Sequence, residues 1–313
     1  MTKNMLHYSL VIFMKKKLSG SLMLLLATII WGSAFVSQNI AMKYMGPFSF
    51  QAIRCAIAVV GLIPVVAIFD RFSKSNKSFF SRWADKKLWI AGILCGIPLF
   101  LACNLQQVGL VDTNPGKSGF LTAMYIVIVP IIGIFRKQKP SPMIPISVLL
   151  AVFGLYFLSC VGVTSISSGD LLTLGCALMF AIQITFVDIF ADSVDALRLN
   201  TIQALVCTVL SAILAICTKE TVTLTGIADC ALPLAHVGLL SMGAGYALQI
   251  MGQKQVEPTT SSLIMSLESV FAVVFEMLIL NQFMDKWEII GCILVFAAVI
   301  LSQIEWKPRK QHN

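Results

Sequence analysis

Apolar side chains in this chain gather in long continuous runs that short charged stretches separate. A helix needs about 20 mainly apolar residues to cross the hydrocarbon core of a bilayer. The strands of a membrane β-barrel would instead alternate in polarity over about ten residues. We therefore predict an all-α polytopic membrane protein with ten transmembrane helices, on segments 18–42, 48–69, 88–108, 114–135, 142–162, 171–190, 199–218, 232–252, 259–280 and 288–304.

Composition narrows the class of protein. Of the 313 residues, 58% are hydrophobic and 12% are charged, against roughly a quarter charged in soluble domains. This excludes an ordinary soluble enzyme and a disordered chain. The nine Cys show no paired spacing, and the three His (His7, His236 and His312) lie far apart. We expect no metal site and no cofactor.

Lysine and arginine set the expected orientation. With ten spans, 18 of the 23 Lys and Arg residues fall on the side of the termini, and three fall on the other side. Positive residues favour the cytoplasmic side. We predict a multi-pass protein of the cytoplasmic membrane with cytoplasmic segments at 1–17 and 306–313. The net charge of +8 then borders the anionic inner leaflet, and no nucleic-acid partner is needed.

The chain also resembles itself. An offset of 143 positions aligns residues 105–159 with 248–302 without a gap, and eleven of the 55 pairs are identical. Gln106 pairs with Gln249, and Tyr125 falls opposite Glu268. We predict two five-helix repeats, 18–162 and 170–305. Because five is odd, the second repeat starts from the opposite face. Such inverted repeats underlie many secondary transporters, with the substrate site between the halves.

Several short stretches, taken in order, point to a known family. They are Trp31-Gly32-Ser33-Ala34-Phe35, then Arg54, Gln106-Gln107-Val108-Gly109-Leu110, Lys117-Ser118-Gly119-Phe120-Leu121-Thr122 and Leu267-Glu268-Ser269-Val270-Phe271-Ala272. In these features the chain resembles the EamA-type transporters of the drug/metabolite transporter superfamily. The resemblance covers about 18–305.

That resemblance implies a ten-helix carrier that moves small metabolites or drugs, often outward and without ATP. It departs from the family pattern at Ser269, where Pro is usual, and at Gln138 and Gln282, which stand near the places of two family Glu residues. These two glutamines put ion pairing at the loop ends in doubt. We expect a small-molecule substrate and the lipid bilayer as partners, and no ATPase subunit. The sequence leaves open whether the protein forms a homodimer.

Ionisable groups inside spans are functional candidates by default. Glu268 lies near the middle of the ninth span. Loss of water favours the neutral form of a carboxyl group there, which would suit proton coupling. A structural hydrogen bond to a neighbouring helix is the alternative. Glu276, eight residues on, fits an exit path or a side chain that reaches the headgroups.

Two cations lie inside predicted spans. Arg54, in the outer third of the second span, needs an anionic partner, water or a substrate. It could bind a substrate carboxylate or form a fixed ion pair, and the sequence does not decide between them. Lys117, near the outer mouth of the fourth span, is a further binding candidate, or it reaches the headgroups.

Amides and aromatic rings complete the candidate site. Gln106, Gln249 and Gln183 lie within spans and must find partners in the bundle; interhelical hydrogen bonding is at least as good an explanation as substrate contact. Trp31, Tyr125 and Phe180 are mid-span aromatics that could line a cavity for a flat or cationic solute. Aromatic core packing is the alternative.

These features favour a secondary active transporter of an amino acid or related metabolite. The family resemblance implies export, and Glu268 could couple transport to protons. Efflux of multiple drugs or lipophilic cations is the alternative. A membrane-embedded enzyme is disfavoured because the sequence contains no HExxH, GxSxG or P-loop motif. A channel is disfavoured because Tyr125 and Glu268 are unequal in the two halves.

Overall fold

The computed structural model describes residues 3–72, 78–113, 115–138, 141–161, 167–280 and 283–304. Gln282 and the predicted tail 306–313 lie outside this set. Within it, every regular element is a helix: α1 (Lys3–Ala41), α2 (Pro47–Phe72), α3 (Phe79–Trp83), α4 (Lys86–Asp112), α5 (Pro115–Thr122), α6 (Tyr125–Phe135), α7 (Met143–Ser159), α8 (Ser168–Phe190), α9 (Ala196–Cys217), α10 (Leu224–Asp229), α11 (Ala231–Ala235), the π-helix η1 (His236–Gly245), α12 (Tyr246–Gln253), α13 (Pro258–Met265), α14 (Leu267–Leu280) and α15 (Lys286–Ser302).

Eight helical stretches in the described part of the chain are long and apolar enough to cross a membrane. This confirms the prediction of an all-α polytopic membrane protein. The ten predicted segments all fall on helices, singly or in consecutive runs. Two of them correspond to α7 and α15, each of 17 residues. The count of ten spans and the side of the termini stay predictions.

Two of the long stretches are broken at matching places. One break, between α5 and α6, falls at Ala123 and Met124, and the other, between α13 and α14, falls at Ser266. Ala123 and Ser266 are 143 positions apart. Tighter i→i−3 bonds replace the α-helical pattern there: Ile126 N–H donates to Ala123 O at 3.0 Å and Ser269 N–H donates to Ser266 O at 3.2 Å. The two long stretches are therefore interrupted in the same way at positions that the offset of 143 pairs.

A third stretch changes its winding. The run 231–253 passes from α11 through the ten-residue π-helix η1 to α12. π-helical turns are rare and are frequently found at functional sites. Two carbonyls of η1 accept the side-chain amide of Asn200, Met242 O at 3.1 Å and Gly243 O at 2.8 Å. Neighbouring helices thus satisfy backbone groups that the wider turn leaves available.

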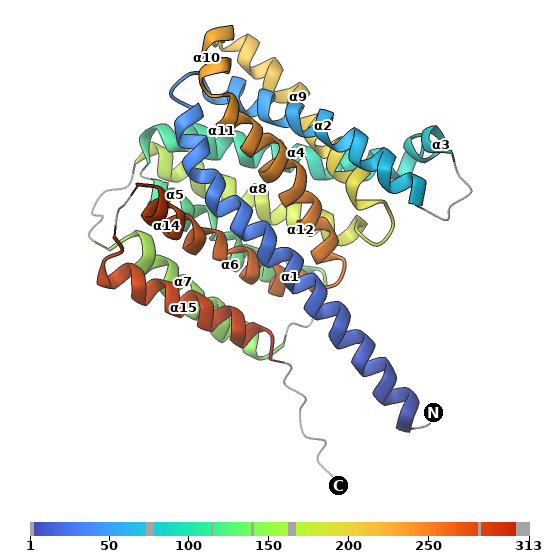
Figure 1. The fold of residues 1–313 in the computed structure, drawn as a ribbon. Helices are drawn as coiled ribbons and strands as arrows, with labels where there is room; N and C mark the ends of the chain where they lie inside the picture. The colour runs from blue at the N-terminus through green and yellow to red at the C-terminus, as the bar shows by residue number, and fades with distance from the viewer. Residues whose placement is uncertain are drawn as a thin grey trace.

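Helices α7 and α15 lie side by side along one edge of the bundle (Figure 1). Their approach depends on glycine. A Cβ atom at Gly291 would lie 2.6 Å from both Gly154 O and Leu158 N. Small residues let membrane helices come this close. Helix α1 crosses the whole bundle, and its N-terminal part extends beyond the other helices (Figure 1).

The interior contains both apolar and polar side chains. One apolar cluster joins α1 to α6, α7, α8, α13, α14 and α15, and its fully buried members include Leu24, Ile126, Leu155 and Leu263. Glutamine side chains are also buried, among them Gln183 and Gln203, each with 0% exposure. Buried amides must be hydrogen-bonded to be tolerated. Three other glutamines, Gln38, Gln106 and Gln249, line one cavity.

Candidate functional site

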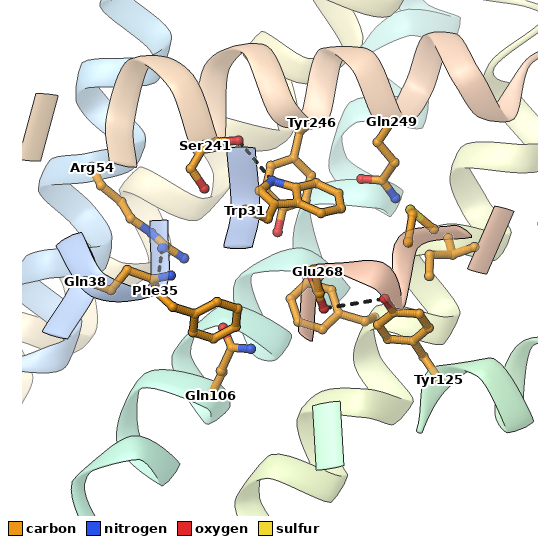
Figure 2. A pocket seen from close by; sticks show the side chains of 13 residues that line it. Trp31, Phe35, Gln38, Arg54, Gln106, Tyr125, Ser241, Tyr246, Gln249 and Glu268 are labelled. Carbon is orange, nitrogen blue, oxygen red and sulfur yellow. Dashed lines mark hydrogen bonds between the residues drawn. The ribbon is translucent and has the colours of Figure 1, made fainter. Parts of the chain in front are cut away.

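A cavity of about 50 Å³ lies at the centre of the bundle. Six of the nine predicted site residues line it: Trp31, Arg54, Gln106, Tyr125, Gln249 and Glu268. Side chains from α1, α2, α4, α6, α8, η1, α12, α13 and α14 contribute to its walls (Figure 2). The volume holds a few water molecules, whereas sites for small molecules measure roughly 300 Å³ or more. In this conformation the cavity is too small for an organic solute.

The carboxyl group of Glu268 lies in this cavity, directly after the helix break. Its side chain is buried, and Tyr125 Oη donates to Glu268 Oε1 at 3.4 Å (Figure 2). No described cation forms an ion pair with it. Tyr125 is the first residue of α6 and Glu268 the second of α14. The two breaks therefore bring together the residues that the sequence offset paired.

A second contact has the same spacing. Cys103 Sγ and Tyr246 Oη lie 3.8 Å apart, and these residues are also separated by 143 positions. Gln106 and Gln249, again 143 apart, both line the cavity. Gln106 Nε2 donates to Thr122 Oγ1 at 3.1 Å. Matching positions of the two halves thus face one another across a shared centre.

Arg54 lies toward the other end of the cavity (Figure 2). It is 4% exposed, and its Nη1 donates to Gln38 Oε1 at 2.9 Å. The guanidinium lies over the Phe50 ring, 5.3 Å from the ring centroid. Among the described residues no carboxylate pairs with Arg54, and its buried Nε has no hydrogen-bond partner. The fixed ion pair that the sequence left open is therefore not seen there.

Gln183 lies behind the cavity wall, in a chain of buried amides. Gln249 Nε2 donates to Gln183 Oε1 at 3.0 Å, and Gln183 Nε2 donates to Gln203 Oε1 at 3.3 Å. Gln203 Nε2 in turn donates to Asn200 Oδ1 at 2.8 Å. These bonds connect α12, α8 and α9. For Gln183 the observed contacts are interhelical hydrogen bonds, and it is not among the residues that line the cavity.

Trp31 forms part of the aromatic wall. Its Nε1 donates to the η1 carbonyl of Ser241 at 3.2 Å, and its ring lies 5.0 Å from that of Tyr246 at a tilt of 54°. Phe35 and Phe180 also line the cavity. Because Trp31 is anchored at its polar edge, its apolar face is held against the central space.

Two predicted residues lie away from this cavity. Lys117 Nζ forms an ion pair with Asp170 Oδ2 at 2.5 Å, and Thr113 Oγ1 donates to the other Asp170 oxygen at 3.1 Å. Glu276 lines a separate cavity of about 20 Å³ beside Ser269. Phe35 borders both cavities.

The family of the chain follows from comparison with known proteins. The model of the EamA-like transporter family matches twice, over residues 18–160 and 167–303. This chain belongs to the EamA-like transporter family. The family is part of the drug/metabolite transporter superfamily. The resemblance found in the sequence motifs is confirmed.

Relatives and a solved structure agree with this assignment. An uncharacterized transporter of Archaeoglobus fulgidus is 31% identical over 92% of this chain and 87% of its own length. The uncharacterized transporter YoaV of Bacillus subtilis is 20% identical over 90% of this chain and 96% of its own. A crystal structure that is 17% identical has a TM-score of 0.76 and covers 91% of this chain and 96% of that one. It shows that the two proteins share a fold.

The sequence analysis missed Gln38, Ser241 and Tyr246 as members of the site. Gln38 is the first bonding partner of Arg54, and it also accepts Gln107 Nε2 at 2.7 Å. Gln38 could have been found from the sequence because it is a polar residue inside the first apolar segment. Tyr246 could have been found as the residue that the repeat offset pairs with Cys103. Nothing in the sequence marks Ser241, because its backbone carbonyl, not its side chain, binds Trp31.

Proposed function

We propose that this protein is a secondary active transporter that exports a small metabolite across the cytoplasmic membrane. One observation carries the proposal: a polar cavity at the centre of an apolar helical bundle contains Glu268 in contact with Tyr125. An ionisable residue at such a place is costly and serves ion or substrate pathways. Membership of a transporter family supports the same class.

The proposed architecture is ten helices in two inverted repeats, 18–162 and 170–305. Residues related by a two-fold axis touch each other only where they lie beside that axis. The Tyr125–Glu268 and Cys103–Tyr246 contacts meet this condition. Transporters with inverted repeats bind substrate near the midplane, at helices that are interrupted there. The matched breaks at Ala123 and Ser266 support this arrangement.

The proposed orientation places both termini in the cytoplasm. Eight stretches are long enough to span, and α7 and α15 supply the other two spans. Seventeen helical residues rise about 26 Å, which is close to the hydrocarbon thickness of about 30 Å. The excess of Lys and Arg on the terminal side supports the orientation.

The proposed substrate is an amino acid or a related solute. Arg54 presents a buried positive charge that no described carboxylate balances, and a guanidinium binds carboxylates in a planar, two-pronged geometry. Glu268, in the same cavity, would face an amine. A solute with both groups would balance both charges.

Efflux of lipophilic cations is the second candidate. Trp31, Phe180 and Tyr246 line the cavity together with Glu268. Aromatic faces and one carboxylate suit a flat cation. The observation against this candidate is Arg54, because its positive charge in the same small space would repel a cationic solute. No comparable observation among the described residues favours a membrane-embedded enzyme or a channel.

Proton coupling would act through Glu268. Among the described residues its carboxyl group has only the neutral Tyr125 hydroxyl as a bonding partner. A carboxyl group in that setting binds either a proton or a cationic group of the solute. Exchange of one for the other, as the cavity opens to alternate faces, would drive export against a gradient.

Transport by purified protein in liposomes tests the proposal. Radiolabelled amino acids and tetraphenylphosphonium serve as probe solutes, with and without an imposed pH gradient. We expect saturable counterflow of an amino acid and its uphill accumulation with the gradient. Glu268→Gln abolishes the uphill accumulation and spares exchange, because the variant cannot release a proton.

Glu276→Gln is the matched control, since Glu276 lies outside the central cavity on the same helix. We expect it to retain uphill transport. Unchanged uphill transport in Glu268→Gln would contradict the proposal that Glu268 couples transport to protons. Conductance that does not saturate with solute concentration would contradict the carrier mechanism.

A further inference from the structure

An apolar hollow lies at the edge of the bundle, away from the central cavity. It has a volume of about 520 Å³ and is bounded by the first half of α1, the α13–α14 break and the C-terminal end of α15. We call it the lateral groove. On α1 its wall is one stripe, from Lys17 and Leu18 through Ser21 and Leu22 to Leu25. This 3–4 spacing places these side chains on a single helix face.

The groove opens toward the surroundings of the bundle. Leu18 is 62% exposed and Leu22 is 52% exposed. Deeper in, Ile264 and Leu267 are buried and form the inner wall. In a membrane such exposed apolar side chains face lipid tails. The groove is therefore a recess in the lipid-facing surface, lined mainly by apolar side chains.

Two polar groups inside this apolar recess lack partners. The Oγ atom of Ser21 and the Nε2 atom of Gln303 are buried, and neither has a hydrogen-bond partner among the described residues. Both residues line the groove, from α1 and α15 respectively. A buried donor without a partner costs free energy, so rotation of these two side chains toward acceptor oxygens of a ligand in the groove would relieve that cost.

Positive charge borders the same groove. Lys17 lines it, and Lys15 and Lys16 are exposed in the preceding turn. From Lys17 to Leu25 the helix rises about 12 Å, which is within the depth of one leaflet of the hydrocarbon core. A basic rim over a narrow apolar slot complements a molecule with an anionic head and a single inserted tail.

We propose that the lateral groove binds an anionic phospholipid of the cytoplasmic leaflet. One acyl chain lies along the α1 stripe against Ile264 and Leu267. The phosphate lies at Lys17, and ester or phosphate oxygens accept from Gln303 and Ser21. The choice of leaflet rests on the proposed orientation of the transporter. Lipid binding itself does not depend on transport.

The site would place a lipid beside the helix break that precedes Glu268. Leu267 lies between Ser266, where the helix breaks, and Glu268, which lines the central cavity. An acyl chain against Leu267 therefore touches the element that carries the proposed proton site.

Photolabelling in lipid nanodiscs tests this site. The full chain is reconstituted with phosphatidylglycerol or with phosphatidylcholine of the same acyl composition, each with a diazirine on one chain, and labelled peptides are identified by mass spectrometry. We expect labels on α1 between Leu18 and Leu25 and on Ile264. The label is expected to be about fivefold stronger with phosphatidylglycerol, the effect of one basic residue at an anionic surface.

Three variants locate the head and the tail. Lys17→Glu removes the phosphatidylglycerol preference, and Lys16→Glu, an equal charge change outside the groove lining, retains most of it. Ser21→Trp fills the slot and removes the label with both lipids. Gln303→Met lowers the phosphatidylglycerol preference without filling the slot, and it keeps the proposal testable if Lys17→Glu does not fold.

The other results would overturn the site. Equal labelling by the two lipids, or a preference that Lys17→Glu and Gln303→Met leave unchanged, means that no anionic headgroup binds there. Absence of label from the groove means that no acyl chain enters it. Because the assay contains no transport step, failure of the transport proposal would leave these outcomes unaffected.

Discussion

Two buried arginines of this protein are held in opposite ways. Arg198, at the start of α9, is 2% exposed and forms ion pairs with Asp70 and, at 3.6 Å, with Asp195. Arg54, at the central cavity, is 4% exposed and bonds an amide oxygen. Both guanidinium groups also lie over aromatic rings, Arg198 over that of Trp83 at 5.4 Å.

The difference distinguishes a cation that holds helices together from a cation that is available to bind a substrate. Asp70 also accepts Arg82 Nη1 at 2.5 Å, so one carboxylate ties the end of α2 to α3 and α9. Breaking a buried pair leaves an unbalanced charge, which is strongly destabilising. Arg54 already has no described carboxylate partner. A buried cation without a fixed carboxylate partner favours the reversible binding of an anion.

The largest expected effect is on stability at Asp70. In Asp70→Asn, Arg198 loses its main counter-charge, so we expect the free energy of unfolding to fall by about 3 kcal/mol. Denaturant titration in detergent measures this change. Transport per folded molecule should stay near the unmodified level, because this cluster lies away from the cavity.

Asp188→Asn is the control for this variant. Its ion pair with Arg136 is more exposed, with side chains 20% and 31% accessible, and we expect a loss below about 1 kcal/mol. Equal losses in the two variants would contradict the structural role given to Asp70.

The next effect is on transport at Arg54. In Arg54→Gln the substrate carboxylate loses a charged hydrogen-bond donor worth about 2 kcal/mol, so the apparent affinity in counterflow should fall about thirtyfold. The free energy of unfolding should not fall by a comparable amount, because no described ion pair is broken. Gln51→Leu, on the same helix but outside the cavity lining, is a matched control for transport. A large loss of stability with unchanged substrate affinity would give Arg54 the structural role that is assigned to Arg198.

Lys117 is the third cation of this comparison and has the smallest expected effect of the three. Its ion pair with Asp170 resembles the Arg198 cluster more than Arg54. In Lys117→Met the Asp170 carboxylate keeps Thr113 and the Ser167 N–H, so we expect a loss of about 1.5 kcal/mol in unfolding free energy. Counterflow should be unchanged. A selective loss of transport would move Lys117 from the structural group to the substrate path.

The sequence was informative where polarity breaks the apolar background. Long apolar runs predicted the helices, and polar residues inside them pointed to Glu268, Arg54, Gln106 and Gln249, all of which line one cavity. In lipid, a helix is apolar on most sides, so hydrophobic periodicity does not indicate which face is buried. Inward faces are readable only from polar, aromatic and small residues.

By itself, then, the sequence determined the helical class, the family and most of the charged and amide groups of the candidate site. Only the tertiary structure decided that Arg54 bonds Gln38 and no described carboxylate, and that Lys117 pairs with Asp170. It also decided that α13 ends at Met265, before Ser266, a residue that helices tolerate. The physical reason is that partners, helix breaks and cavities depend on neighbours far apart in sequence, whereas membrane insertion depends on the composition of each segment alone.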